Sequence, residues 1–176
     1  MTSRFGSHFF IALFLTALAL APARAQMGGP TPLEMATTTP FGQAKFTDPS
    51  GNVSYRVGAV FTAPGNADLR VSMTFICQPG ALSLYAVQTR VPRDQAASPK
   101  VAFSVDGATI QATAKREIAN GLSAYTVTSA AEAEVLAKAM GAGKGLLMIL
   151  DDGAYTVSLE GLRAALDKLA AVCPHG

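Results

Sequence analysis

The sequence contains no tryptophan and only two histidines, His8 and His175. His8 lies in the N-terminal segment that we expect to be removed as a signal peptide. His175 lies next to the last residue, on a chain end that we expect to be mobile. A Ser–His–Asp or Cys–His arrangement needs a histidine held firmly beside its nucleophile. The sequence therefore offers no such catalytic group, and we expect a protein that is not an enzyme.

The sequence also has no large excess of charge of either sign. The chain has 14 Lys and Arg against 12 Asp and Glu, and without Arg4 and Arg24 the two signs balance. The sequence has no basic stripe that would indicate a nucleic acid or an anionic membrane surface as a partner. The histidines, cysteines and methionines form no metal-ligand motif, and the sequence predicts no cofactor.

Long hydrophobic runs are confined to the N-terminus. Residues 9–20 are apolar, but the run is shorter than the roughly 20 residues of a membrane-spanning helix. Arg4 precedes the run and the small residues Ala23 and Ala25 follow it, which is the pattern of a secretory signal peptide. We expect cleavage after Ala25, a periplasmic or secreted product, and no membrane span after cleavage.

Cysteine occurs only twice, at Cys77 and Cys173. In an exported protein an isolated pair indicates a disulfide. Two buried thiols and a metal site are the alternatives. Cys77 continues an alternating strand and Cys173 ends a helical stripe, so both sulfurs are predicted to point inward. The bond would then fasten the C-terminal helix to a central strand.

Alternating apolar and polar residues predict a series of half-buried strands. Residues 26–50 are rich in Pro, Gly and Thr instead, and predict an extended or poorly ordered arm with one short edge strand near residues 44–46. The arm is either a segment that docks onto a partner or a connection that leads into the domain without a function of its own. Tight turns are predicted at Asp106–Gly107, Asn120–Gly121 and Asp152–Gly153. The predicted strands cover residues 53–59, 71–77, 82–89, 101–105, 110–114, 122–127, 146–150 and 155–157.

The periodicity becomes helical after residue 127. Ser129 and Glu132 have the spacing of a capping box, and Gly141 and Gly143 predict the end of that helix in a left-handed turn. Ser158 is predicted to cap a last helix, whose apolar stripe is Leu159, Leu162, Leu166, Leu169 and Cys173. The sequence thus predicts a single α+β domain over residues 51–176, with an antiparallel sheet or β-sandwich of about seven to eight strands and two helices.

Two groups of charged residues are candidate sites. Asp151 and Asp152 form the only adjacent carboxylate pair of the sequence and are candidates for acid–base chemistry, but a predicted turn favours a structural role for them. Arg90, Arg93 and Lys100 flank a proline-bounded loop over residues 90–100. With Lys115 and Arg116 they are predicted either to form a small basic patch for a partner or to be solvated loop charges.

Residues 70–173 carry a resemblance to known proteins. A strand ends in Cys77, a second covers residues 81–85, and a hairpin follows at residues 105–107. A short helix, a leucine-rich strand and the segment 157–166 then lead to Cys173. This order resembles small exported proteins of proteobacteria, of the invasion-associated locus B type and of the accessory proteins of type VI secretion. The resemblance implies a periplasmic accessory or binding domain without catalytic residues to carry over.

These observations favour a non-enzymatic periplasmic accessory or protein-interaction domain with an envelope protein as its partner. Inhibition of an envelope enzyme through a rigid loop is one form of this hypothesis. Two alternatives stay open: a carrier that holds a small apolar ligand inside the sheet, and a hydrolase that uses carboxylates.

Overall fold

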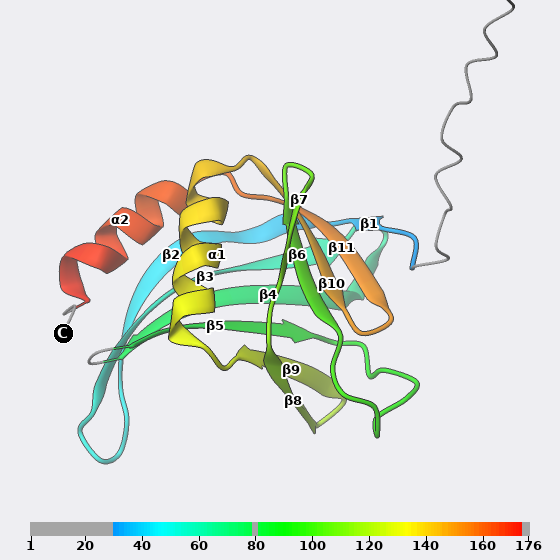
Figure 1. Ribbon diagram of the computed structural model, residues 1–176, viewed down its shortest axis with the longest axis horizontal. Coiled ribbons are helices and arrows are strands. Elements are labelled where there is room, and N and C mark those ends of the chain that lie inside the picture. Colours follow the sequence, from blue (N-terminus) through cyan, green and yellow to red (C-terminus); the bar gives the residue numbers. More distant parts are fainter. Residues whose placement is uncertain (1–29, 79–80, 174–176) are drawn as a thin grey trace, which may run out of the picture.

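The computed structural model describes residues 30–78 and 81–173, which contain eleven strands and two helices (Figure 1). The predicted signal peptide and its cleavage site lie outside the described residues. The strands are β1 (Leu33–Glu34), β2 (Ala36–Thr47), β3 (Val53–Ala63), β4 (Asn66–Gln78), β5 (Ala81–Gln88), β6 (Val101–Val105), β7 (Ala108–Gln111), β8 (Ala114–Ala119), β9 (Leu122–Val127), β10 (Gly145–Leu150) and β11 (Gly153–Ser158). The helices are α1 (Ala130–Ala142) and α2 (Leu162–Val172). Neither described helix has the length and apolarity that crossing a membrane requires.

The strands form two sheets. The larger has the order β2-β3-β4-β5-β9-β8 and is antiparallel throughout. The smaller has the order β1-β11-β10-β6-β7, in which only the pairing of β1 with β11 is parallel. The predicted α+β class with antiparallel sheets and two helices is confirmed.

The structure describes more strands than the sequence predicts, because two segments form strands that their sequence patterns do not indicate. The predicted strand over residues 110–114 is in fact two strands, since the chain leaves the smaller sheet after Gln111 and enters the larger one at Ala114. The predicted arm also contributes β1 and β2. Instead of one short edge strand near residues 44–46, β2 pairs with β3 from Ala36 to Thr47.

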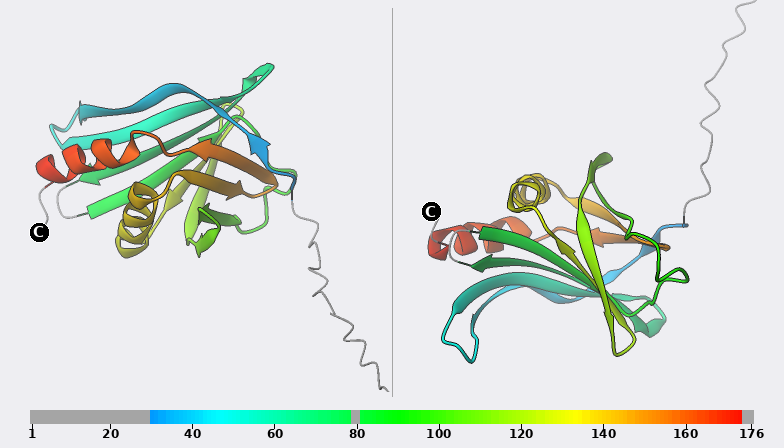
Figure 2. Two further views of the ribbon diagram at one scale, coloured as in Figure 1. Left: turned by 90° about the horizontal axis from the view of Figure 1, so that it is seen from above. Right: turned by 60° about the horizontal axis from the view of Figure 1, so that its bottom comes forward.

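The helices and the smaller sheet cover the same face of the larger sheet (Figure 2). α1 packs on β5, and α2 packs on β2 and β3. Period-two alternation directs every second side chain of the large sheet toward these elements. The interior is filled by side chains that are almost completely buried, among them Phe61, Met73, Phe75, Leu84, Phe103, Leu136, Met140, Met148 and Leu162.

The start of α1 follows the sequence prediction, whereas its end does not. The Ser129 side chain accepts a hydrogen bond from the Glu132 amide at 3.3 Å, as expected of an N-cap. Gly143 caps the C-terminus with a φ of −89°, so the predicted left-handed turn is absent. A side chain at Gly143 would collide with Val105, and close packing therefore explains this glycine.

Two further local predictions were wrong. The cap of α2 is Gly161 rather than Ser158, and the Ser158 hydroxyl accepts from the Glu160 amide before the helix starts. The turn between β10 and β11 consists of Asp151 and Asp152, because Gly153 already pairs with Leu150. Asp151 has a φ of 53°, a left-handed conformation that aspartate tolerates better than most residues.

The predicted disulfide is present between Cys77 and Cys173. Cys77 lies near the end of β4 and Cys173 directly follows α2, and both residues are buried. The bond therefore joins the C-terminal helix to the end of an inner strand of the larger sheet. Leu162, Ala165 and Leu169 bury the adjoining face of α2, so the covalent link and the hydrophobic contact hold the same helix.

Removal of the disulfide will lower the stability of the folded chain. The two cysteines are 96 residues apart, and a cross-link over so long a loop restricts the unfolded chain strongly. We expect the double variant Cys77→Ala/Cys173→Ala to lose about 2–5 kcal/mol in the free energy of unfolding, measured by urea titration. A double variant as stable as the oxidised protein would contradict this expectation.

Candidate functional site

The predicted interaction loop lies between β5 and β6, at the right of Figure 1. Arg90, Arg93 and Lys100 are exposed, whereas Pro92 is buried beneath them. The three cations line one hollow of about 710 Å³ together with the β10–β11 turn. The structure thus brings together all three residues that the sequence singled out in this loop.

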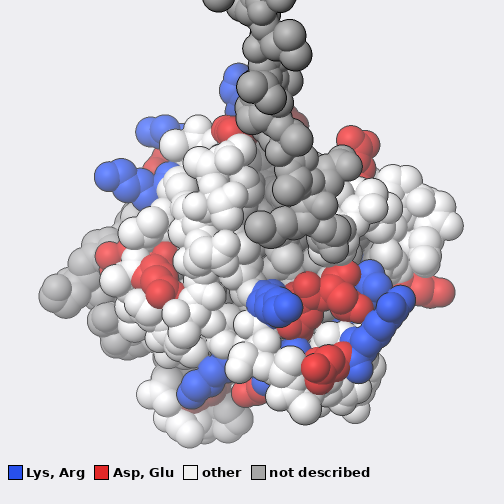
Figure 3. All heavy atoms as spheres, turned by 45° about the vertical axis from the view of Figure 1, so that its right-hand side comes forward, with Lys and Arg blue, Asp and Glu red and all other residues white. Residues whose placement is uncertain are grey.

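Charges of both signs surround this hollow. Arg90 forms an ion pair with Asp152, at 3.4 Å between guanidinium nitrogen and carboxylate oxygen. Asp94 also lines the hollow, and its side chain accepts hydrogen bonds from the amides of Ala96 and Ala97 at 3.0 and 3.1 Å. Figure 3 shows acidic and basic side chains interspersed on this side of the molecule. The lining of this hollow therefore carries charges of both signs.

Arg116 belongs to the interior instead of the predicted basic patch. It pairs across the strands with Tyr125 of β9, on the inner face of the larger sheet, and only 5% of its side chain is exposed. Its guanidinium donates to the backbone oxygens of Gln95, at 2.5 Å, and Ala97, at 2.8 Å. A buried cation therefore holds the exposed loop from beneath. Its sequence neighbour Lys115 is exposed.

Asp151 balances the charge of Arg116. The guanidinium donates to Asp151 Oδ2 at 2.7 Å, and only 9% of the Asp151 side chain is exposed. The Lys100 amide donates to Oδ1 at 2.9 Å, and the Asp151 amide donates to the Lys100 carbonyl at 2.8 Å. Buried charges are tolerated when they are paired and hydrogen-bonded in this way. Asp151 thus ties the end of the loop to the smaller sheet.

The polar contacts continue between the two sheets. The Tyr125 hydroxyl donates to Asp151 Oδ2 at 2.8 Å and accepts from Gln88 Nε2 at 2.7 Å. The Tyr155 hydroxyl donates to Gln88 Oε1 at 2.5 Å. Gly153 leaves room for this contact, because a Cβ there would lie 2.8 Å from Gln88 Oε1. We call Gln88, Arg116, Tyr125, Asp151 and Tyr155 the bracing network.

Burial controls the ionisation of both tyrosines in the bracing network. Burial raises the pKa of Tyr125 well above its ordinary value of 10.0, and the hydrogen bond to the Asp151 carboxylate adds to this effect. Burial is also the main cause that raises the pKa of Tyr155. Both phenols therefore stay protonated at neutral pH and act as hydrogen-bond donors.

This geometry gives Asp151 a structural task. Its two oxygens accept from Arg116, Tyr125 and the Lys100 amide, so no free position is left on Oδ2 for a substrate. Among residues 30–78 and 81–173, no group of three His, Cys, Asp or Glu side chains has the arrangement of a metal site. The network is built to hold a loop.

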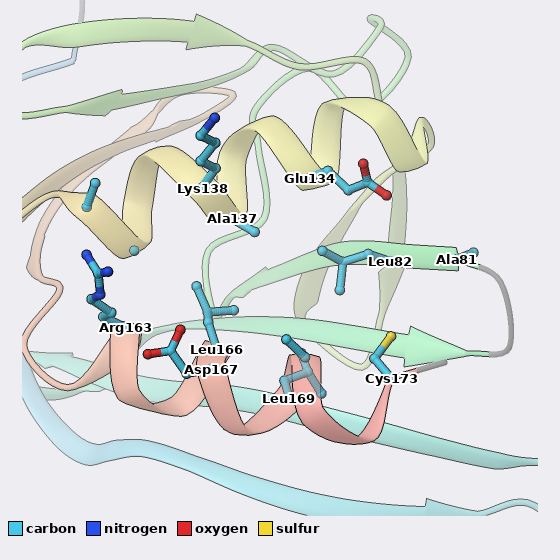
Figure 4. A pocket seen from close by; sticks show the side chains of 13 residues that line it. Ala81, Leu82, Glu134, Ala137, Lys138, Arg163, Leu166, Asp167, Leu169 and Cys173 are labelled. Atoms are coloured by element: carbon cyan, nitrogen blue, oxygen red, sulfur yellow. The ribbon is translucent and has the colours of Figure 1, made fainter. Parts of the chain in front are cut away.

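A second hollow, of about 560 Å³, lies between α1 and α2 (Figure 4). We call it the helix groove. Leu82 of β5, Leu166, Leu169 and Cys173 give it an apolar floor. Four charged residues also line it: Glu134 and Lys138 on α1, and Arg163 and Asp167 on α2. The predicted stripe of α2 includes Leu166, which is half-buried, packs against the core and also lines this groove.

The comparisons add no relative to this description. The chain matches no protein-family model, no curated protein and no solved structure. The resemblance to exported accessory proteins therefore stays a prediction. The sequence analysis named Arg116 and Asp151, but in other roles, and it missed Gln88, Tyr125 and Tyr155. Gln88 occupies an inward position of an alternating strand, and a glutamine at such a position is the signal that could have indicated a buried polar contact.

Replacement of Arg116 by methionine will loosen the loop. Asp151 would lose its buried counter-charge, which costs about 3–5 kcal/mol in the free energy of unfolding. We also expect faster trypsin cleavage after Arg93, because the carbonyls of residues 95 and 97 lose their donor. Lys115→Met is the matched control, since it removes a neighbouring exposed charge. Equal stability and cleavage in the two variants would refute the bracing role.

The tyrosines predict a loss of stability in alkali. Their pKa values are raised in the folded state, so stability is complete below about pH 10 and falls above it, where the unfolded phenols ionise first. Tyr125→Phe will make this fall shallower in urea titrations at increasing pH, while costing about 1 kcal/mol at neutral pH. Tyr85→Phe, on the outer face of the larger sheet, is the control. An unchanged alkaline slope in Tyr125→Phe would contradict the prediction.

Proposed function

We propose that this chain is a non-enzymatic accessory domain of the periplasm that binds an envelope protein through the loop of residues 90–100. The observation that carries the proposal is the bracing network. A loop without regular secondary structure accepts two hydrogen bonds from the buried Arg116, at the carbonyls of Gln95 and Ala97, and Arg116 is itself paired with Asp151. Binding loops are commonly presented by a rigid scaffold in this way.

Rigidity favours binding because a loop already held in one conformation loses less entropy when a partner engages it. The exposed side chains above the network then provide the contacts. Arg90, Arg93 and Lys100 are exposed, and acidic groups lie among them. This mixture suits a protein surface with complementary charges better than a uniformly anionic polymer. Inhibition of an envelope enzyme is compatible with such a loop.

An exported location supports the same proposal. The predicted signal peptide directs the chain out of the cytoplasm, and the Cys77–Cys173 disulfide is stable in an oxidising compartment. The bracing network uses Asp151 structurally, which weakens the alternative of a carboxylate-dependent hydrolase. One observation supports the carrier alternative, namely the apolar floor of the helix groove. In the described part of the chain, the space between the two sheets is filled by side chains and leaves no room for a ligand.

Site-specific cross-linking in the host periplasm tests the proposal. A photoreactive residue is placed at Ala96 on the exposed loop or at Asn120 in the exposed β8–β9 turn. We expect one dominant protein adduct from position 96 and none from position 120. The adduct should disappear in the triple variant Arg90→Ser/Arg93→Ser/Lys100→Ser, which removes the exposed loop cations.

The matched control is Lys45→Ser/Lys115→Ser/Lys168→Ser, which removes three exposed cations from other elements. It should keep the adduct at full yield. Arg116→Met should lower the yield without changing any surface charge, because the loop is no longer held. An adduct that forms equally from position 120, or that survives loss of the loop cations, would overturn the proposal.

A further inference from the structure

The outermost strands of the two sheets differ in how well they are protected against pairing with another chain. β1 has two residues and β7 has four, and β8 presents the exposed charges of Lys115 and Glu117. Short length and charge are common means by which proteins prevent edge strands from pairing. β2, which borders the larger sheet in Figure 2, has 12 residues, and Lys45 is its one charged residue. It is therefore the longest and least charged of these edges.

Only the first part of β2 carries a protective feature. Between Thr37 and Gly42 the register with β3 shifts twice, and Pro40 lies in this part. Bulges and prolines both interrupt the pairing of an edge strand. From Gly42 to Thr47 each residue pairs with a single residue of β3, without a shift. We call residues 42–47 the open edge, because a further strand can add to a regular edge of this kind.

The turn after β2 shows which backbone groups of the open edge point outward. The Asp48 amide donates to the Asn52 carbonyl at 3.0 Å, so Asp48 directs its backbone toward the neighbouring strand. Along an antiparallel pair, residues that direct their backbone groups toward the partner alternate with residues that direct them away. The even-numbered residues of the open edge therefore hydrogen-bond to β3. The amides and carbonyls that point away from the sheet belong to Gln43, Lys45 and Thr47.

The side chains of the open edge alternate between the two faces of the sheet. Gln43 pairs with the buried Val57, so the odd-numbered residues face the interior and the even-numbered ones face the other way. Phe46 lies on this outer face and is 47% exposed. Gly42 lies on the same face, and among the described residues only the Pro40 carbonyl would come within 4 Å of a Cβ there, at 3.8 Å. The outer face thus carries an exposed aromatic ring and, four residues away, an open space above a glycine.

We propose that two copies of this chain associate through their open edges, antiparallel about a twofold axis at Ala44. In this register Gln43 pairs with the partner's Lys45, and Ala44 pairs with the partner's Ala44. Phe46 then lies beside the partner's Gly42, and an aromatic ring that covers a glycine across two strands stabilises their pairing. A register centred on Lys45 would place two ammonium groups opposite each other, which destabilises a strand pair. The charge of Lys45 therefore selects the register at Ala44.

The second copy is the occupant that the open edge fits best. Any extended peptide can bind an edge through its backbone, but the side chains decide which peptide it is. About the axis at Ala44, the open edge supplies both the exposed ring and the glycine that accepts it, so each copy completes the other. The open edge is much shorter than the about 20–30 residues that a standard interface has on each side, and we therefore expect a weak dimer.

Sedimentation equilibrium of the full exported chain over a series of concentrations tests the proposal. We expect a reversible monomer–dimer equilibrium. Ala44→Arg should weaken dimerisation at least about tenfold, because it places two guanidinium groups opposite each other at the axis. Ala119→Arg is the matched control, since it puts the same charge at an exposed position of the other edge strand of the larger sheet, β8. Both alanines are exposed, so both variants should unfold at the same urea concentration as the parent chain.

Cysteine cross-linking tests the register. Directly opposite residues at a position of this kind have Cα atoms about 4.5 Å apart, which is within the range that a disulfide spans. Ala44→Cys should therefore form a covalent dimer under mild oxidation, seen on a non-reducing gel. Thr47→Cys is the control on the same strand, and it should stay monomeric because the register at Ala44 keeps the two copies of residue 47 apart.

The dimer is independent of the proposed function. The loop of residues 90–100 contributes no residue to β2, so the paired molecules keep both loops available. The triple variant Arg90→Ser/Arg93→Ser/Lys100→Ser should therefore dimerise normally, and Ala44→Arg should keep the loop adduct from position 96. A failed dimer and a failed loop partner are thus separable.

Several results would overturn the proposal. They are a chain that stays monomeric at every concentration, a dimer that Ala44→Arg and Ala119→Arg weaken equally, and a covalent dimer that forms from position 47 but not from position 44. A monomeric chain that cross-links from position 44 to another envelope protein would assign the open edge to a strand of that protein.

Discussion

A buried ion pair holds together the parts of this molecule that are far apart in sequence. Arg116 belongs to the larger sheet and Asp151 to a turn of the smaller one, and their charged groups are 2.7 Å apart. The same guanidinium binds the carbonyls of Gln95 and Ala97, so it joins both sheets and the loop between them. Removal of either partner leaves an uncompensated buried charge, which makes the three parts depend on one another.

The opposite end of the molecule is held by apolar and covalent contacts. The disulfide between Cys77 and Cys173 fixes α2 to the larger sheet, and Leu169 of α2 is buried near this bond. In Figure 1, α2 and the loop lie at opposite ends of the larger sheet. The chain thus separates a polar, hydrogen-bonded end from an apolar, disulfide-linked one. Each end leaves one hollow, and the chemistry of its lining differs accordingly: mixed charges at the loop, leucine and small residues at the helices.

Much of the fold could be predicted because its strands alternate regularly. Each inward position of β4 through Cys77 is buried as expected, and so are most positions of the α2 stripe. Most of β2 escaped prediction, apart from the short segment near residues 44–46, because this edge strand is exposed on nearly every residue and carries no alternation. The bracing network escaped prediction because proximity in the sequence groups Arg116 with Lys115, although neighbouring residues in a strand face opposite sides.

The sequence by itself determined which residues face inward, where Asp106–Gly107 and Asn120–Gly121 turn, and which cysteines pair. These properties depend on neighbours in the chain, since the repeat of a strand or helix is set locally. Only the tertiary structure decided that Arg116 meets Asp151, 35 residues away, and that Leu166, at the edge of the core, also lines a groove. A buried charge must find its counter-charge on another element, and whether a helix face is covered depends on how closely its neighbour approaches. Neither condition can be predicted from the pattern of neighbouring residues in the sequence.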